Sequence, residues 1–167
     1  MGPPFLLLIF STVAFVFDIK TMKIPNAVIL CGYVSGLMSE IYLSRPSGLI
    51  LFAAGSAIPV ILLWITFRFR MIGAGDIKLL SAIGGIILYP SIIRFLIATL
   101  VFSSVLSLIQ MLRCGIFKQR FLFFFRYISD LIHGKYYPYR KNGSAPENIH
   151  LTVPVLMSTV LYAGGML

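Results

Sequence analysis

Charged residues are scarce in this chain, and acidic residues are the scarcest of them. Only 11% of the 167 residues are Asp, Glu, Lys or Arg, whereas a soluble globular domain carries roughly 25%. With 59% hydrophobic residues, the chain cannot cover a folded surface with polar groups. The composition therefore excludes a soluble domain and predicts an integral membrane protein, which has lipid as its solvent.

Residues that bind metals are equally few. The sequence has two cysteines, Cys31 and Cys114, which are far apart and belong to no CxxC pair. A structural zinc site needs about four ligands, and two isolated thiols with His133 and His150 are a poor set. We therefore expect no metal and no other cofactor, and we interpret both cysteines as free thiols that pack within the protein.

Basic residues give the chain a net charge of +9, which would suggest a nucleic-acid partner for a soluble domain. The sequence, however, has neither a basic-aromatic platform nor a groove-reading motif. Its basic residues gather at the junctions between apolar runs, as they do in the cytoplasmic loops of membrane proteins. We therefore expect no nucleic acid as a partner and expect the lipid bilayer instead.

Long apolar runs are what the sequence has in abundance. A membrane-spanning helix needs about 20 apolar residues, and Pro, Gly and basic junctions divide this chain into runs of that order. The N-terminus lacks a basic n-region and an A-x-A-like cleavage site, so the first run is expected to stay as a span. The predicted fold is all-α, a polytopic membrane helix bundle forming one domain over residues 1–167. Its six expected transmembrane helices cover about residues 3–23, 26–43, 49–67, 73–90, 91–112 and 149–167.

Residues 113–148 form a basic insert of a different character. Lys118, Arg120 and Arg126 interrupt an aromatic run there too often for another span. A basic, aromatic-rich segment of this kind predicts a helix that lies in the membrane interface. The end of the insert, residues 133–148, is rich in Tyr, Pro, Gly and Asn and is interpreted as a loop.

The basic residues are divided unevenly between the two predicted sides of the membrane. If the N-terminus is outside, the segments 18–25, 68–78 and 113–150 are cytoplasmic and hold twelve of the 14 Lys and Arg residues. The outer loops then hold only Arg45 and Arg94. Because cytoplasmic loops are enriched in Lys and Arg, this asymmetry predicts six spans with both termini outside.

Two of the five acids, Asp18 and Asp76, fall at comparable positions. The first apolar run stops at Phe17, which is too short for a span, so the helix must continue through Asp18. Asp76 follows Gly73 and Gly75 at the opening of the fourth run, and the predicted topology puts both acids at the cytoplasmic end. A charged side chain at the centre of a membrane helix costs about 3 kcal/mol, so acids within spans indicate a function.

The residues alone leave several roles open for these acids. Two neighbouring aspartates could share one proton, so that one activates a water as general base and the other protonates the leaving group. The helix N-terminus near Asp76 favours its ionised form, which suits the base. Alternatively, Asp76 caps its helix, Asp18 pairs with Lys20 or Lys23, or both acids relay protons or ions.

The segments around both acids resemble the type IV prepilin peptidases. Asp18 lies in FDIKTMKIPN, which is similar to that family's first-aspartate segment: an Asp, then basic residues, then a hydrophobe followed by Pro and Asn. Asp76 lies in GAGDIKL, which resembles the family's GxGD motif followed by a hydrophobe, Lys and Leu. Pro154 and the Gly164-Gly165 pair in the final run are similar to the Pro- and Gly-containing last helix of the family.

This resemblance implies an intramembrane aspartyl endopeptidase that removes basic leaders from type IV pilin-like precursors at the cytoplasmic face of a prokaryotic plasma membrane. Asp18 and Asp76 would be its catalytic pair. The larger family members carry an N-terminal extension with CxxC motifs and also methylate the mature pilin, so peptidase activity alone is implied here. The residues that would shape the site and its loops are Gly73, Gly75, Lys78, Pro25 and Asn26.

Two other functions compete with the peptidase. A small proton- or ion-coupled transporter could use the two aspartates as relay groups, although transporter sites lie near the membrane midplane. A catalytically silent partner of a secretion machine could also retain both acids. Within the peptidase hypothesis, the acids outside the pair are expected to tolerate substitution, namely Glu40, Asp130 and Glu147.

The predicted topology can be tested by cysteine labelling in a variant without Cys31 and Cys114. A cysteine that replaces Arg45 is expected to react with a membrane-impermeant maleimide in intact cells. A cysteine that replaces Lys23 should react only after the membrane is permeabilised, because the basic segments stay in the cytoplasm. The reverse pattern would overturn the topology.

Overall fold

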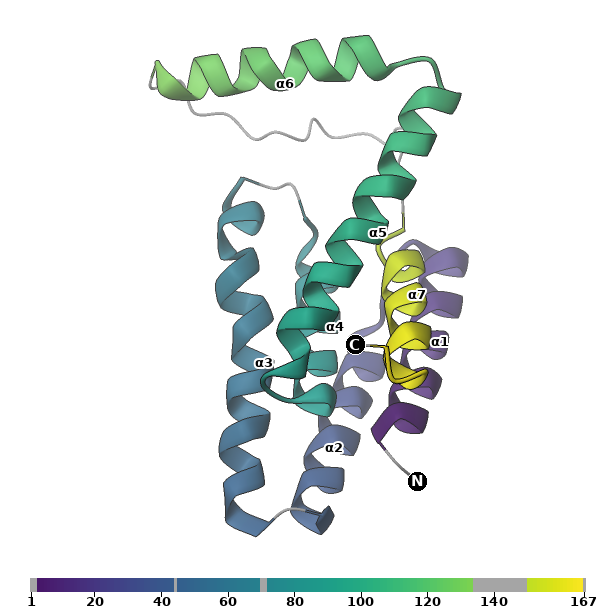
Figure 1. Ribbon diagram of the computed structural model, residues 1–167, viewed down its shortest axis with the longest axis vertical. Coiled ribbons are helices and arrows are strands. Elements are labelled where there is room, and N and C mark those ends of the chain that lie inside the picture. The colour runs from purple at the N-terminus through teal and green to yellow at the C-terminus, as the bar shows by residue number, and fades with distance from the viewer. Residues whose placement is uncertain (1–2, 44, 70–71, 134–149, 167) are drawn as a thin grey trace.

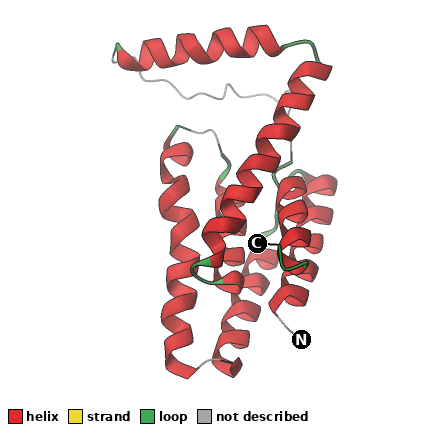
Figure 2. Cartoon of the chain, in the orientation of Figure 1, coloured by secondary structure: helices red, strands yellow, loops and turns green. Residues whose placement is uncertain are grey.

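The structure is a computed structural model that describes residues 3–43, 45–69, 72–133 and 150–166. Every regular element in the described part of the chain is an α-helix (Figure 2), which confirms the predicted all-α fold. The seven helices are α1 (Pro3–Thr21), α2 (Asn26–Leu43), α3 (Arg45–Arg68), α4 (Ala74–Ile87), α5 (Ser91–Arg113), α6 (Phe117–Ile132) and α7 (Thr152–Ala163).

Six of these helices form a bundle, and α6 lies across one end of it (Figure 1). Successive bundle helices run in alternating directions, so α1 ends and α4 begins at the end of the bundle that α6 crosses. The closest neighbours of α4 are α3 and α2, whereas α7 packs between α1 and α5. Helix α4 is therefore the centre of one half of the bundle and α7 the centre of the other.

Glycines let the helices around α4 approach closely. Gly55 of α3 and Gly84 of α4 pack backbone against backbone, since a Cβ on either residue would collide with the carbonyl oxygen of the other. Gly36 of α2 packs against Gly85 and the side chain of Ile86 on α4. Small residues at such contacts are typical of membrane helix pairs, in which dispersion contacts between backbones replace the hydrophobic effect. These contacts bury α4 on all sides from Leu79 to Ile87.

Within the described part of the chain, three helices are long and apolar enough to cross a membrane, namely α1 over Pro4–Thr21, α3 over Gly48–Arg68 and α5. Helices α4 and α7 are shorter than the spans predicted for them, with 14 and 12 residues. Helix α4 ends at Ile87 because Leu88 adopts a positive φ of 66° and Pro90 follows. The chain is a membrane protein, and the six crossings remain a prediction.

Buried hydroxyl groups bind α7 to both of its neighbours. Ser11 of α1 and Thr159 of α7 are hydrogen-bonded at 2.9 Å, and Thr99 of α5 donates to Ser158 of α7 at 3.0 Å. Hydrogen bonds between membrane helices contribute on average about 0.6 kcal/mol each. Because a hydroxyl pair aligns only when both helices are at one height, these bonds also define the register of α7.

The basic insert contains a helix, as predicted. This helix is α6, which has 16 residues. It is strongly amphipathic, with Phe121, Phe125 and Ile132 spaced along one exposed face. An amphipathic helix that lies across the ends of apolar helices fits the plane of the membrane surface. Its position in the interface remains a prediction, and residues 134–149, where a loop is predicted, lie outside the described part of the chain.

Depth measurements can test the interfacial position of α6. A spin label at position 124 is expected near the headgroup region, because Arg120 and Arg126 on the same helix gain about 1 kcal/mol each beside anionic lipids. A label at position 97, an exposed residue within α5, gives the matched deep control. A label at 124 as deep as the label at 97 would show that α6 spans the membrane.

Candidate active site

Asp18 occupies the last turn of α1 and is buried, with 8% of its surface exposed. The helix continues through this residue, as its predicted span requires. Its Oδ2 atom accepts a hydrogen bond from the Thr152 hydroxyl at 2.7 Å, and the Nδ1 atom of His150 lies 3.1 Å from the same oxygen. Both partners lie at the start of α7. His150 is 132 residues and Thr152 is 134 residues after Asp18 in the sequence.

The alternative pairing of Asp18 with a nearby lysine is not what the structure shows. Lys20 and Lys23 are exposed, and Asp18 contacts His150 and Thr152 instead. The carboxylate therefore points toward α7 and the interior of the bundle. In this orientation it is held by side chains from a distant part of the sequence.

Asp76 lies in the first turn of α4, two residues after the helix begins. The N-cap is Gly73, whose carbonyl oxygen accepts hydrogen bonds from the backbone N–H groups of Asp76 at 3.2 Å and Ile77 at 3.3 Å. The side chain of Asp76 turns back over Gly73, so that a Cβ added to Gly73 would lie 3.1 Å from Oδ2. Asp76 is partly exposed, and Gly73 rather than Asp76 is the N-cap.

The two motifs that flank the acids meet at one contact. Lys78, which follows Asp76, donates a hydrogen bond to the side-chain oxygen of Asn26 at 3.4 Å. Asn26 begins α2, and Pro25 before it accepts backbone hydrogen bonds at the helix start. The structure thus brings together Lys78 and Asn26, which the sequence places 52 residues apart. Gly75 has no other group within 4 Å of its missing Cβ, so the space beside it is open.

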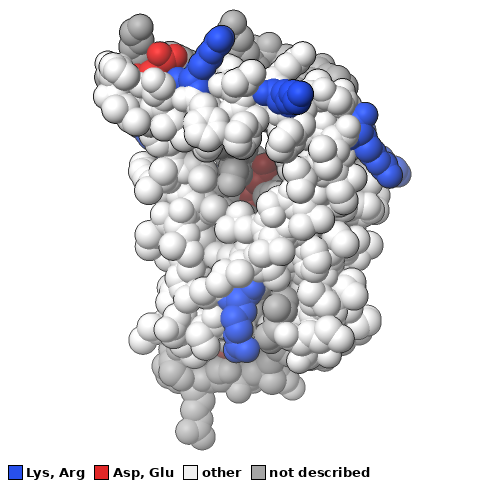
Figure 3. All heavy atoms as spheres, turned by 45° about the horizontal axis from the view of Figure 1, so that its top comes forward, with Lys and Arg blue, Asp and Glu red and all other residues white. Residues whose placement is uncertain are grey.

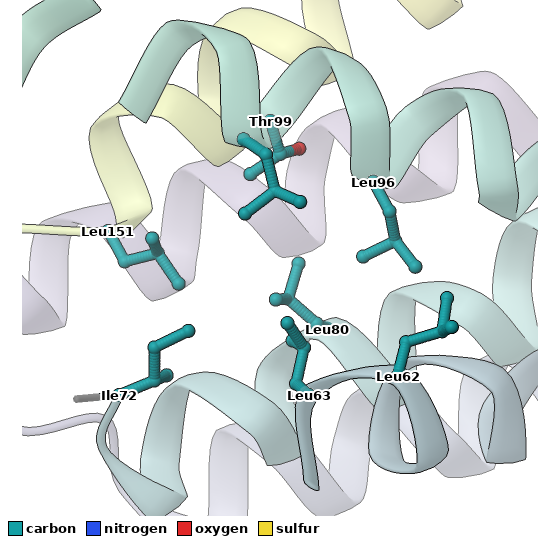
Figure 4. A pocket seen from close by; sticks show the side chains of 8 residues that line it. Leu62, Leu63, Ile72, Leu80, Leu96, Thr99 and Leu151 are labelled. Atoms are coloured by element: carbon teal, nitrogen blue, oxygen red, sulfur yellow. The ribbon is translucent and has the colours of Figure 1, made fainter. Parts of the chain in front are cut away.

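An apolar cavity of about 40 Å³ lies beside these segments (Figure 4). Ile72, next to Gly73 in sequence, faces it from the start of α4, and Leu151, between His150 and Thr152, faces it from the start of α7. The segments that carry Asp76 and the partners of Asp18 therefore border one cavity. Its other lining residues are Leu62, Leu63, Leu80, Leu96, Thr99 and Leu100.

The face crossed by α6 is hollowed, and acidic side chains are visible inside the hollow (Figure 3).

Among the described residues, no group of three or more His, Cys, Asp and Glu could hold a metal ion. Cys31 and Cys114 are free thiols, as predicted, but both are exposed instead of packed inside the protein.

The sequence interpretation missed His150 and Thr152. It treated His150 only as a poor metal ligand and gave Thr152 no role. The alternating directions of the helices were the signal that could have identified these two residues. The last predicted span begins at the end of the bundle where Asp18 lies. Polar residues at that start had to face either lipid headgroups or the carboxylate.

These observations define a membrane helix bundle with one acid at the end of its first helix and another at the start of its fourth, at one end of the molecule. The chain matches the type IV leader peptidase family over residues 5–111, a stretch that includes both acids. This match covers more than half of the chain, so the protein belongs to the type IV leader peptidase family, and the resemblance of its motifs is confirmed. The family implies aspartic-type peptidase activity and pilin precursors as substrates in general terms. No curated protein and no solved structure matches the chain.

If Asp76 is a catalytic residue of a leader peptidase, Gly73→Ala is expected to slow leader cleavage on the order of tenfold, because small misplacements of catalytic groups are costly. The new Cβ would displace the Asp76 carboxylate by a few tenths of an ångström. The backbone of Gly73, at φ −73° and ψ 148°, suits alanine, so thermal stability should not change. Gly75→Ala is the stability control, since its Cβ meets open space. Unchanged cleavage by Gly73→Ala would show that Gly73 does not set the position of Asp76.

Proposed function

We propose that this protein is an intramembrane aspartyl endopeptidase that removes basic leaders from type IV pilin-like precursors at the cytoplasmic face of the membrane, with Asp18 and Asp76 as its catalytic pair. The observation that carries this proposal is the position of the two acids. They occupy the last turn of α1 and the first turn of α4, two helices in contact, at one end of the bundle. Both also lie within the residues that match the family.

Peptide hydrolysis by such a pair requires one proton and one water. Two carboxyl groups in a site of low dielectric constant do not both ionise, so the pair shares a proton. The ionised carboxylate removes a proton from the water as it attacks the peptide carbonyl, and the protonated carboxyl donates to the departing amine. Because the proton belongs to the pair, neither residue is assigned permanently as the acid or the base.

The surroundings of the pair suit a precursor with a polar leader and an apolar helix. Both acids lie at the end of the bundle that α6 crosses, where a polar leader would stay in water while the apolar helix that follows enters lipid. Lys78, Asn26 and Pro25 border the start of α2, and the open space beside Gly75 leaves room for an extended substrate backbone. We assign these residues and Gly73 to shaping the substrate site, within a single peptidase domain.

The transporter hypothesis is less well supported. Relay groups of secondary transporters stand near the midplane, where substrate must be reached from both sides in turn. Here both acids lie in terminal turns of their helices, at one end. The family match adds independent weight to the peptidase.

The dyad is tested with purified protein in detergent and a synthetic precursor that has a basic leader followed by an apolar segment. Asp18→Asn and Asp76→Asn are each expected to reduce the cleavage rate on the order of 10³-fold or more, and the double variant only slightly further, because residues that act as a unit are non-additive. Precursor binding should persist, since Asn keeps the shape of Asp. EDTA should leave cleavage unchanged, because a pair of aspartates requires no metal.

Asp130→Asn is the matched control, because it makes the same chemical change on α6, outside the bundle. Glu40 is unsuitable for this purpose, although the sequence had suggested it. It is 4% exposed and its Oε2 atom has no hydrogen-bond partner among the described residues, so its replacement would alter stability. Glu147 lies outside the described part of the chain. Near wild-type cleavage by Asp18→Asn, or a loss in Asp130→Asn equal to that of the dyad variants, would reject the pair.

A further inference from the structure

The start of α7 makes two contacts with a single oxygen of Asp18. The Thr152 hydroxyl donates to Oδ2 at 2.7 Å, and Nδ1 of His150 lies 3.1 Å from that oxygen. Thr152 is almost fully buried, with 1% of its surface exposed, and His150 is partly buried. Neither residue belongs to the stretch that matches the family, which ends at residue 111.

Two donors on one carboxylate oxygen orient the whole group. A carboxylate has two equivalent oxygens, and rotation about its Cβ–Cγ bond exchanges them unless one of them is held. With Oδ2 held by α7, Oδ1 is the oxygen left to face a water or a second acid. Hydrogen bonds to a charged group are short and about twice as strong as those between neutral groups, and the 2.7 Å contact with Thr152 has this character.

Thr152 is the first residue of α7, a helix that is itself held firmly, and His150 precedes this helix by two residues. Farther along α7, Thr159 bonds to Ser11 of α1 and Ser158 bonds to Thr99 of α5. Both contacts are buried and far from Asp18 along the helix, since residues 152 and 159 are about two turns apart. A donor at the start of a helix with a defined register, as Thr152 is, holds its acceptor more accurately than a donor on a loop.

We propose that Thr152 and His150 are positioning residues of the peptidase, which hold Oδ2 of Asp18 so that Oδ1 faces the water that attacks the substrate. This inference rests on the proposed function, because it assigns Asp18 to catalysis. The inference goes beyond the proposed function because it also assigns a role in catalysis to the start of the last helix. A function in catalysis, rather than in folding alone, follows from the convergence of both donors on one oxygen of one acid.

The kinetic test compares isosteric variants on α7. Thr152→Val removes only the hydroxyl and is expected to lower kcat roughly 10- to 100-fold with KM unchanged, the range that corresponds to one hydrogen bond to a charged group. Thr152→Ser retains the hydroxyl and should restore most of the rate. Thr159→Val is the matched control, because it makes the same chemical change on the same helix and removes a buried bond to α1 that does not involve Asp18.

His150 is tested by rescue. His150→Ala should lower kcat, and His150→Asn should recover part of it, because the Asn side-chain nitrogen can occupy the place of Nδ1. Thermal stability is measured for every variant. Equal losses of kcat in Thr152→Val and Thr159→Val would show that α7 serves the fold and not the carboxylate, and would overturn the inference. Wild-type kcat in Thr152→Val, beside an inactive Asp18→Asn, would overturn it while leaving the proposed function intact.

A second measurement does not depend on peptidase activity. The chain has only two histidines, so ¹⁵N-histidine NMR in detergent yields the nitrogen signals of two imidazole rings, which a His133→Gln variant assigns. Asp18→Asn is expected to shift the ring nitrogen signals of His150 and to leave those of His133 unchanged. Unshifted His150 signals would reject the contact with Asp18. Shifted signals in a protein that cleaves no precursor would support the contact but overturn both its catalytic purpose and the proposed function.

Discussion

A carboxylate buried in an apolar helix bundle is the constraint on which this structure depends. Transfer of an ionised side chain away from water is costly unless hydrogen-bond donors replace its hydration. Asp18 meets this requirement through Thr152 and His150, which lie at the other end of the sequence. The first and the last helix must therefore pack side by side, and the hydroxyl pair of Ser11 and Thr159 continues the same interface farther along the bundle.

The position of Asp76 depends on a different kind of contact. Helix α4 is short and buried on almost all sides, and its Gly84 touches the backbone of α3 at Gly55. Close backbone contact leaves little freedom to slide or rotate, because a shift along the axis would bring side chains into collision. The first turn of α4 is thus held at one height beside α1. The Lys78–Asn26 hydrogen bond joins the same turn to the start of α2.

The two halves of the bundle place the two acids by separate means. Helix α7 holds Asp18 by polar contacts, and helices α2 and α3 hold Asp76 by close packing around α4. The apolar cavity lies between these halves, bordered by Ile72 on one side and Leu151 on the other. In the proposed mechanism, the peptide bond is presented at this end of the bundle to two acids that are supported independently of each other.

Much of this organisation could be predicted from the sequence. Apolar runs and their Pro, Gly and basic boundaries predicted every helix to within a few residues, except that α4 and α7 proved shorter. A helix in lipid must satisfy all of its backbone groups internally, so local composition alone determines where it forms. Two predicted spans, an even number, separate Asp18 from Asp76, which predicted that both lie at one end, and the motifs around them predicted the family.

Only the tertiary structure decided which side chains surround each acid. Lys20 and Lys23 are the nearest cations to Asp18 in sequence, yet its partners come from residues 150 and 152. Glu40 is expected from the sequence to tolerate substitution, yet this residue is buried. The physical reason is the same in both cases. Helix periodicity and length are local properties of the chain, whereas the rotation of one helix against another depends on the packing of residues distant in sequence, such as Gly55 on Gly84 and Ser11 on Thr159.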